Sequence, residues 1–560
     1  MAVIFAISVF CLCLIFNYQA FIFCRPEISA FWEFYLPKLS ISVALSGFVF
    51  LMKRKYWTVI LSIVLGLWTF ANLVYLRSSG RVLDAYSFTM AGNMRGFWDS
   101  VISFVYRSDA MLLIPTVLVI LGWRFVYKHN GIHKRSFFGF AVFVLSALLL
   151  HTGDFMLRSK KKELPFNPFT KDAGWLWGGE VCTSNTYVAY TSIIHSLIYG
   201  LSNPIGRGAE QSDYMLTKSD ENRLKTFVNH GGDCPVPKGN LVIILVESLE
   251  GWALSPVATP NLCRFIDAHT DHCLTADKVK RQTAGGVSGD GQMIINTGLL
   301  PVMDGAACFR FPENKYPSLS SLYDSPAIFF PGGKDVWNQS AMDKAYGINV
   351  EYGFDQRKYD IKRNPRMDDA ILSSVCENCG EHSFILALTF ASHTPFRRYA
   401  HISPAETGPD MPEMMRDYLN CLHYTDSCMG KFLNLVDTNS TLRNSTIVIT
   451  GDHSIFDMER VSEFNQYLQK AGADYEIMEG NTALVIYSPS IREETRISAQ
   501  CYQMDIYPTV LNLIGCGGYY WRGFGIDLLN PDAGRPISEE DAYILSDRII
   551  RSDYFNTNDW

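Results

Sequence analysis

The chain has 560 residues, which is more than one ordinary domain needs, so at least two structural regions are expected. Its formal net charge of −7, with no long basic block, argues against a nucleic-acid partner. Hydrophobic residues make up 48 % of the chain and gather near its start, which indicates a membrane region followed by a region in water.

The membrane region is expected over residues 1–155, with about five helices. Several of its apolar segments approach the roughly 20 residues that cross a bilayer, although the second and fifth are short. Basic residues in 53–55 and 128–135 fall in alternate loops, and cytoplasmic loops are enriched in such residues. This pattern predicts a cytoplasmic N-terminus and an extracytoplasmic location for everything after the fifth helix. The five segments are 1–23, 34–52, 57–76, 110–127 and 136–152.

A cleavable signal peptide is the alternative for the first apolar segment. The segment lacks a charged beginning, and more apolar segments follow it, so a membrane anchor is favoured.

Two further stretches could lie at the membrane surface. Residues 85–107 mix aromatic and polar side chains, which suits either an interfacial helix or an ordinary loop helix. The basic run at 158–162 suits either lipid headgroups or a solvated linker. Residues 156–235 are expected to form linker helices that lead into the next domain.

The second domain is expected over residues 236–535, with a C-terminal tail at 536–560. Apolar runs of strand length alternate there with helical patterns, which is typical of a mostly parallel sheet covered by helices, an α/β fold. The predicted strands are 241–246, 327–330, 384–390, 446–450 and 483–487.

Polar residues follow three of these strands and are expected to meet at one edge of the sheet. Glu247 follows the first strand, His393 the third, and Asp452 with His453 the fourth. Two carboxylates and an imidazole suit a divalent cation such as Mn²⁺ or Zn²⁺. Each residue alone has a structural explanation: a helix cap for Glu247, a turn for Asp452 and His453, and a hydrogen-bonded core histidine for His393.

A glycine-rich segment, residues 282–301, places Ser288 where a loop should turn into a helix. A hydroxyl at a helix N-terminus lies among backbone N–H groups that favour a phosphate or sulfate group, so Ser288 is a candidate nucleophile and a fourth metal ligand. The structural alternative is that Ser288 serves only as the N-cap of the helix.

The 14 cysteines offer two candidate local disulfides if the second domain is extracytoplasmic. These are Cys263 with Cys273 and Cys376 with Cys379. A zinc site at Cys376 and Cys379 is the competing interpretation, but no second ligand pair has matching spacing.

Taken together, these motifs resemble the lipoteichoic acid synthase-like proteins, membrane members of the alkaline phosphatase/sulfatase superfamily, along nearly the whole chain. Glu247 lies in a segment that resembles the first metal motif of that family, and residues 451–453 match its Gly-Asp-His. Ser288 stands where those synthases usually carry threonine. The other similar segments are 259–262, 337–338 and 504–515, together with His393.

The resemblance implies one divalent metal ion, with Mn²⁺ favoured and Zn²⁺ as the alternative. Its ligands would be Glu247, Ser288, Asp452 and His453, and the catalytic residues would be Ser288 and His393. The substrate pocket would contain Trp337, Asn338, Gln339 and His393. Two departures concern this pocket, because Gln339 replaces an arginine of the family and Pro331 replaces a histidine.

The implied function is that of a membrane-anchored phosphotransferase in the bacterial cytoplasmic membrane. It would move a phospholipid headgroup, glycerol phosphate or similar, through phospho-Ser288 to an extracytoplasmic glycan or lipid acceptor. The alternatives are a phosphoethanolamine transferase, a sulfatase-like phosphoester hydrolase, and a binding protein without catalysis that is tethered to the membrane. Formylglycine-dependent sulfate hydrolysis is disfavoured, because Ser288 lacks the Pro and Arg that this modification requires.

Overall fold

The computed structural model describes most of the chain as two compact units, residues 1–88 with 100–206 and residues 89–99 with 207–560. The linker predicted at 156–235 and the surface segments at 85–107 and 158–162 lie largely outside the described residues. The described ranges are 1–24, 35–79, 83, 87, 98–126, 135–159, 216–229 and 235–557, except 55, 303–304, 334–335, 356–357, 360–361, 363–364, 397, 457, 474 and 531–533.

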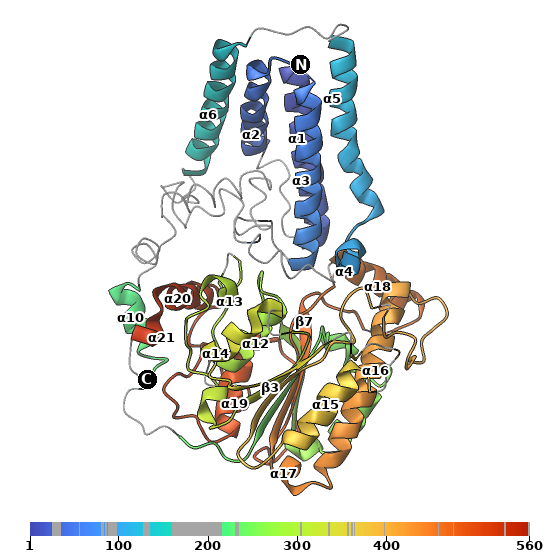
Figure 1. Ribbon diagram of the computed structural model, residues 1–560, viewed down its shortest axis with the longest axis vertical. Coiled ribbons are helices and arrows are strands. Elements are labelled where there is room, and N and C mark those ends of the chain that lie inside the picture. The colour runs from blue at the N-terminus through green and yellow to red at the C-terminus, as the bar shows by residue number, and fades with distance from the viewer. Residues whose placement is uncertain are drawn as a thin grey trace. The chain divides into compact units, whose positions relative to one another are not determined.

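Apolar helices form the first unit (Figure 1). Within the described residues, three helical segments are long and apolar enough to cross a membrane, at Ala2–Gln19, Trp57–Ser78 and Arg107–Phe125. Two shorter apolar helices, Lys38–Leu51 and Phe137–Leu150, lie at the segments that the sequence marks as short. The helices are α1 (Ala2–Cys24), α2 (Tyr35–Gly47) with η1 (Phe48–Leu51), α3 (Trp57–Ser79), α4 (Trp98–Ser103), η3 (Arg107–Leu112), α5 (Leu113–Val126) and α6 (Phe137–Ser159).

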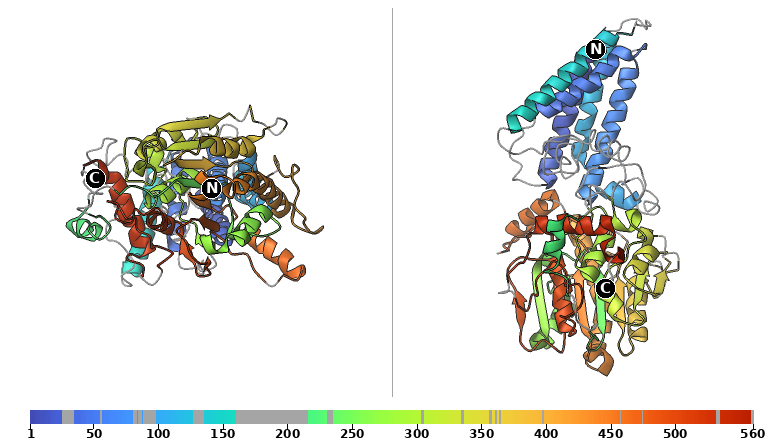
Figure 2. Two further views of the ribbon diagram at one scale, coloured as in Figure 1. Left: turned by 90° about the horizontal axis from the view of Figure 1, so that it is seen from below. Right: turned by 90° about the vertical axis from the view of Figure 1, so that its left-hand side faces the viewer.

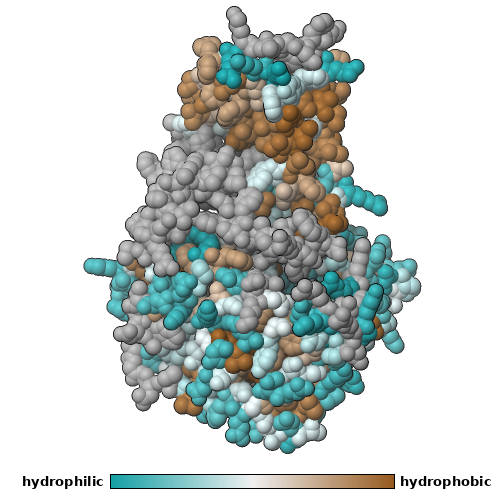
Figure 3. All heavy atoms as spheres, viewed as in Figure 1, coloured by the Kyte–Doolittle hydropathy of each residue, from teal (hydrophilic) through white to brown (hydrophobic). Residues whose placement is uncertain are grey.

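The outer surface of this unit is predominantly hydrophobic over its described helices (Figure 3). Leu67 of α3, Phe125 of α5 and Phe138 of α6 are all exposed. Helices that are apolar on their outer as well as their inner faces are suited to lipid and not to water.

One buried ion pair fastens two segments of the first unit. Arg77, in the last turn of α3, donates to both carboxylate oxygens of Asp109 in η3, at 2.7 and 2.8 Å. It also donates to the carbonyl oxygen of Phe104 at 2.8 Å. Because a buried charge is costly unless it is paired and hydrogen-bonded, this bidentate contact fixes the end of α3 against the start of the η3–α5 segment.

A nine-stranded sheet forms the centre of the second unit, in the order β4-β3-β5-β1-β6-β7-β2-β8, with β9 paired to β2. The strands are parallel except β7, which runs opposite to β6 and β2. The mostly parallel α/β sheet expected from the sequence is confirmed. The strands are β1 (Leu241–Val246), β2 (Cys273–Lys280), β3 (Ala327–Pro331), β4 (Val350–Phe354), β5 (Phe384–Leu388), β6 (Thr446–Gly451), β7 (Asn481–Tyr487), β8 (Thr495–Ile497) and β9 (Cys501–Tyr502).

The sequence prediction missed four of these strands. Charged residues interrupt the apolar pattern of β2, and β4 contains a glycine and is only partly buried. β8 and β9 have 3 and 2 residues, too few for a period to be recognised.

Helices cover both faces of the sheet, which gives three layers (Figures 1 and 2). All six residues of β1 are buried: Leu241, Ile243 and Leu245 belong to one hydrophobic core, and the alternate residues belong to the other. On the first face lie α12 (Ser288–Thr297), α14 (Gln339–Ala345) and α19 (Ile506–Leu513). On the second lie α11 (Pro260–Ala268), α15 (Met367–Asn378), α16 (Glu413–Val436) and α18 (Met458–Lys470).

The register of the central strands β5, β1 and β6 aligns their ends at the site. β1 pairs in parallel with β5 and β6, so Leu245 lies beside Leu388 and Val246 lies beside Gly451. The residues that immediately follow these three strands therefore emerge at one edge of the sheet, as the sequence predicts.

Both ends of the second unit extend beyond the predicted domain limits of 236 and 535. Before it, α10 (Lys218–Leu224) contributes Leu224 to the core. After it, the segment expected to be a tail forms α20 (Glu539–Ser552) and α21 (Tyr554–Thr557). Leu545 and Ile549 of α20 are buried in the core, since its apolar residues recur at helical spacing.

The described cysteines are all thiols, including Cys263, Cys273, Cys376 and Cys379. Neither candidate pair is therefore a disulfide in this structure. Burial raises the pKa of Cys376 and of Cys379 to about 11, which disfavours the thiolate form that binds metals and attacks disulfides.

If α20 is part of the folded domain, Leu545→Ala should lower the free energy of unfolding by about 2–5 kcal/mol, because it leaves a cavity in the core. Ile544→Ala is the matched control on the same helix. Its side chain is 38 % exposed, so a change within about 0.5 kcal/mol is expected. Urea unfolding of the full chain in detergent measures both, and equal effects would show that α20 is not anchored in the core.

Candidate active site

Three of the predicted ligands meet at the edge of the sheet. Ligand atoms of Glu247, Asp452 and His453 all lie within 4.8 Å of one another, and the three side chains are buried. Nε2 of His453 lies 3.5 Å from a carboxylate oxygen of Glu247 and 3.5 Å from one of Asp452. Among the described residues this is the one group of His, Cys, Asp and Glu side chains with such spacing, and the cysteines at 376 and 379 form no such group.

The electrostatics of this cluster fit a cation. Burial, and then the nearby Asp452 carboxylate, raise the pKa of Glu247 well above its usual range. Nδ1 of the buried His453 has no hydrogen-bond partner among the residues described. Two buried acids and an imidazole at this spacing supply the donor set that Mn²⁺ and Zn²⁺ accept, and a divalent cation would balance the acids.

Short hydrogen bonds hold the two acids in place. Asp452 accepts from the backbone N–H of Ser248 and from that of His453, both at 2.9 Å. The Ser248 hydroxyl donates to Glu247 at 2.8 Å, and Ser248 itself adopts a positive φ of 52°. A serine in this disfavoured region is retained only when its surroundings fix it, and such strain gathers at functional sites.

A third buried acid, Glu250, supports the loop that follows Asp452 and His453. Glu250 accepts from the hydroxyl of Ser454 at 2.9 Å and from the backbone N–H of Ile455 at 2.8 Å. The hydroxyl of Tyr418 donates to the carbonyl of Ser248 and accepts from the N–H of Glu250. Glu250 and Tyr418 therefore position the two chain segments that carry the cluster.

Ser288 is the first residue of α12, and its predicted alternative role as N-cap is wrong. The N-cap is Val287, and no side chain caps this helix end. Val287 has φ 43° and ψ −111°, which is strained for a β-branched residue. Asp290 fixes the loop before it by accepting from the backbone N–H groups of Ala284 and Gly286, at 2.8 and 2.9 Å.

The start of α12 packs against the backbone of the cluster. A Cβ added to Gly291 would lie 2.5 Å from the carbonyl oxygen of Asp452, so only glycine allows this approach. Residues three apart share a helix face, so half-buried Ser288 lies on the face that meets Asp452. Gln503 strengthens the contact, because it donates to the carbonyl of Asp452 at 2.8 Å and accepts from the backbone N–H of Gln282 at 2.7 Å.

His393 follows β5 at the same edge. Its Nδ1 lies 2.9 Å from the carbonyl oxygen of Thr394, and burial lowers its pKa below the usual 6.5. The preceding chain is fixed by Asp368, which accepts from the N–H groups of Phe390 and Ala391, and by Ser392, whose hydroxyl donates to the carbonyl of Glu247 at 2.6 Å. His393 is therefore tied to the strand end that carries Glu247.

The predicted substrate-pocket segment forms a strained turn into α14. Trp337 and Asn338 both have φ of 54°, and the amide of Asn338 donates to the carbonyl of Cys308 at 2.7 Å. Gln339 is buried, and its amide pairs with Gln292 of α12 at 2.9 Å and with Asp343 at 2.8 Å. Gln339 thus joins α14 to the Ser288 helix, and its contact with substrate stays a prediction.

Two family models and several curated relatives match the chain. The model of the lipoteichoic acid synthase N-terminal domain matches residues 1–172, and the sulfatase model matches residues 321–516. Lipoteichoic acid synthase 2 of Bacillus subtilis (strain 168) is 22 % identical over 561 residues, covering 93 % of this chain and 82 % of the relative. Lipoteichoic acid synthase of Staphylococcus saprophyticus is 21 % identical over 528 residues, covering 89 % and 78 %.

The resemblance predicted from the sequence, to the lipoteichoic acid synthase-like proteins of the alkaline phosphatase/sulfatase superfamily, is confirmed by these matches. The enzyme class expected from the sequence, a sulfatase-family phosphotransferase, is confirmed, and the chain is a membrane protein. The superfamily is metal-dependent. Among solved structures, that of the lipoteichoic acid synthase LtaP from Listeria monocytogenes is similar with a TM-score of 0.47 and 17 % identity, covering 60 % of this chain and 98 % of that one.

Several residues that shape the site were not predicted from the sequence. Glu250, Asp290, Asp368 and Gln503 are buried, and each holds backbone from a different part of the chain. Of these four residues, only Asp290, two residues after Ser288, could have been found from the local sequence, because an acid in the first turn of a helix is favourable. The partners of the other three lie far away in sequence, where no local pattern can indicate them.

Alanine substitutions at two glycines of α12 test the close approach of this helix to Asp452. Gly291→Ala should push α12 away from the cluster and lower phosphotransferase activity by about tenfold or more, since displacements near 1 Å are that costly. In Gly289→Ala, the new methyl would meet Met342 at 3.4 Å and Cys308 at 3.9 Å, which are ordinary contacts, so most activity should remain. Equal loss in both variants, measured as product formation under saturating Mn²⁺, would contradict this packing argument.

Proposed function

We propose that this protein is a metal-dependent phosphoglycerol transferase of the bacterial cytoplasmic membrane, with its second unit on the extracytoplasmic side. It would take a glycerol phosphate headgroup from a phospholipid and pass it to a glycan or lipid acceptor. The observation that carries the proposal is a strained helix start with Ser288, packed on the backbone of a buried Glu247–Asp452–His453 cluster. The similarity to synthases of lipoteichoic acid supports glycerol phosphate as the group transferred.

Glu247, Asp452 and His453, with the hydroxyl of Ser288, would hold one divalent cation, Mn²⁺ in the favoured case and Zn²⁺ in the alternative. When bound, such a cation lowers the pKa of a coordinated hydroxyl and polarises a phosphoryl oxygen. The buried carboxylates are already fixed by backbone N–H groups, so little reorganisation would accompany binding.

The reaction would proceed in two displacements. In the first, the deprotonated Oγ of Ser288 forms a bond to phosphorus, the bond from phosphorus to the diacylglycerol oxygen breaks, and protonated His393 gives its proton to that oxygen. In the second, the now neutral His393 takes the proton of an acceptor hydroxyl, whose oxygen attacks phosphorus and releases Ser288 again as the alkoxide. The lowered pKa of His393 is compatible with both roles, because it makes the protonated imidazole a stronger acid toward the leaving oxygen and keeps the neutral form available to take the acceptor proton.

A cation for the substrate phosphate is needed because Gln339 stands in the place of an arginine. Arg398 is the candidate: its guanidinium carbon lies 5.8 Å from the centre of the Phe390 ring, and that ring lies 5.5 Å from the ring of His393. Its positive charge also contributes to the lowered pKa of His393. An arginine beside His393 would supply the planar donors that bind phosphate.

Disulfides in an extracytoplasmic domain would favour the phosphoethanolamine transferase alternative. The described cysteines are thiols, so that support is absent from this part of the chain. A measurement of which lipid is turned over therefore has to decide between glycerol phosphate and phosphoethanolamine as the group transferred.

Ser288→Ala should abolish headgroup transfer, with a loss of at least about 10³-fold, because the attacking oxygen is removed. Ser288→Thr keeps a hydroxyl and introduces the threonine that those synthases usually carry, so it should retain activity within about tenfold. The assay incubates the full chain in detergent with Mn²⁺ or Zn²⁺ and fluorescent phosphatidylglycerol or phosphatidylethanolamine, and follows diacylglycerol release.

Release from phosphatidylglycerol by wild type and Ser288→Thr, but not by Ser288→Ala, is the expected result. Turnover confined to phosphatidylethanolamine would instead assign the alternative headgroup. Equal release by Ser288→Ala and wild type would contradict the phosphoserine mechanism.

A further inference from the structure

Five aromatic side chains form one cluster in the hydrophobic core of the second face of the sheet. Phe456 is at its centre, because its ring centroid lies 4.9, 5.0, 5.7 and 6.1 Å from those of the other four rings. Aromatic pairs are favourable at centroid distances of roughly 4.5–7 Å. The members of this aromatic cluster are Trp252, Phe396, Tyr418, Phe456 and Phe464.

Three of these rings come from the segments that carry the candidate catalytic and ligand residues. Phe396 follows His393 by three residues, and its backbone N–H donates to the carbonyl oxygen of His393 at 3.2 Å. Phe456 follows His453 by three residues, and Trp252 lies in the segment after β1. The aromatic cluster therefore joins the chain that follows β5, β6 and β1 at one place in the core.

The contact between Phe396 and Phe456 links the segment of His393 directly to that of His453. Their ring centroids lie 5.7 Å apart. Tyr418 of α16 packs on both rings, with centroid distances of 5.3 Å to Phe396 and 4.9 Å to Phe456. Because the three rings contact one another in a closed triangle, a shift of one segment against the other would separate packed rings.

The backbone holds Phe396 in this position at a cost in local conformation. Phe396 has a positive φ of 68°, which is disfavoured for a bulky side chain. Its carbonyl oxygen accepts from the thiol of Cys421 on α16 at 2.8 Å. Such strain persists only where the surroundings fix it, and it gathers at functional sites. The turn after His393 is therefore determined by the packing of Phe396.

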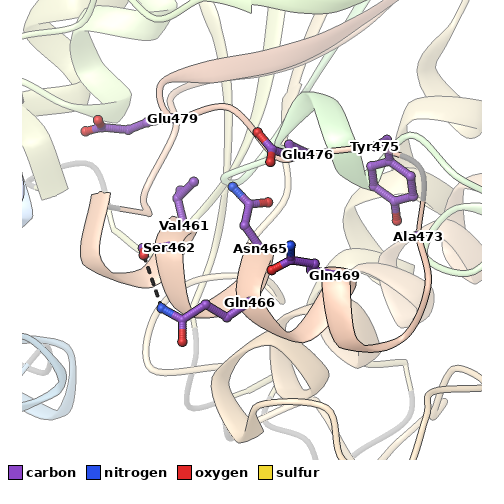
Figure 4. A pocket seen from close by; sticks show the side chains of 9 residues that line it. All are labelled: Val461, Ser462, Asn465, Gln466, Gln469, Ala473, Tyr475, Glu476 and Glu479. Atoms are coloured by element: carbon purple, nitrogen blue, oxygen red, sulfur yellow. Dashed lines mark hydrogen bonds between the residues drawn. The ribbon is translucent and has the colours of Figure 1, made fainter.

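Helix α18 supports the aromatic cluster. Phe464 of this helix is buried against Phe456, with ring centroids 5.0 Å apart. A different face of α18 lines a groove of about 730 Å³ (Figure 4). There the amide of Asn465 donates to the carbonyl of Ile477 at 2.9 Å and accepts from its N–H at 2.8 Å. Since α18 is held on two faces, it limits movement of the rings that pack on it.

We propose that Phe396, packed on Phe456 and Tyr418, is a positioning residue for proton transfer by His393. Its ring fixes the turn that carries the imidazole relative to the three proposed metal ligands. Loss of the ring shifts His393 and slows the step in which its proton passes to the leaving oxygen of diacylglycerol. This inference rests on the proposed function, in which His393 is the acid of the first displacement.

Two donors distinguish a loss of proton transfer from a general loss of activity. The alkoxide that leaves phosphatidylglycerol requires a proton, whereas the p-nitrophenyl ester of glycerol phosphate releases p-nitrophenolate, which does not. Single-turnover reactions with excess full chain in detergent and Mn²⁺ measure the first displacement alone. Phe396→Leu should slow diacylglycerol release by about tenfold or more and p-nitrophenolate release by no more than about twofold.

His393→Gln shows what loss of the acid itself does. It should slow diacylglycerol release by about a hundredfold or more and leave p-nitrophenolate release within about threefold, because only the first reaction needs the proton. Phe396→Leu is expected to show the same selectivity with a smaller loss, since it displaces the imidazole and does not remove it.

Phe432→Leu is the matched control. Phe432 and Phe396 are each 1 % exposed and belong to the same hydrophobic core, but Phe432 lies outside the aromatic cluster. Phe432→Leu should leave release from both donors within about twofold. Thermal unfolding shows whether each variant is folded. If Phe396→Leu unfolds, Phe396→Met replaces it, because the flexible Met side chain fills volume without restoring the ring contacts.

The inference is overturned if the folded Phe396 variant slows both donors equally or slows neither, or if Phe432→Leu shows the same selective loss. Failure of the proposed function gives different results. Wild type would then release product from neither donor, or His393→Gln would release diacylglycerol as fast as wild type does, and the inference would fail with it.

Discussion

Two carboxylates buried against each other are the constraint on which the site depends. Glu247 and Asp452 emerge from neighbouring parallel strands, with ligand atoms within 4.8 Å of each other and of His453. Burying like charges together is unfavourable, and here it raises the pKa of Glu247. Backbone N–H groups on Asp452 and the Ser248 hydroxyl on Glu247 offset part of this cost. A divalent cation would offset the rest.

The surrounding structure holds the candidate nucleophile, Ser288, next to these two acids. The Ser288 helix approaches Asp452 through a glycine, and Gln503 joins the start of its segment to the Asp452 carbonyl. Three residues with a positive φ, Val287, Ser248 and Trp337, lie beside the site. Such conformations persist because the neighbouring hydrogen bonds determine them more strongly than local preference does.

The sequence was sufficient for the parts that follow from local pattern and parallel topology. Strands rich in Val, Ile and Leu were recognisable, and their shared direction implied that Glu247, Asp452 and His453 would meet. Long-range contacts were not recognisable. The position of Gln339 after Trp337 and Asn338 predicted a contact with substrate, but gave no sign of its pairing with Gln292 on another helix. The prediction that Ser288 is the N-cap was wrong. Ser288 is the first residue of α12 itself, and the strained Val287 before it is the N-cap.

The central claim is that the three strand-end residues bind one metal ion per chain, and electron paramagnetic resonance of added Mn²⁺ tests it most directly. After removal of free ion, wild type should retain close to one equivalent of Mn²⁺ per chain, with the signal of bound ion. Asp452→Asn keeps the shape of the side chain but removes its charge, and should lower Mn²⁺ affinity by at least about tenfold. Asp541→Asn is a control at an exposed ion pair with Arg223 and should bind as wild type does. Full Mn²⁺ binding by Asp452→Asn, or none by wild type, would contradict the account.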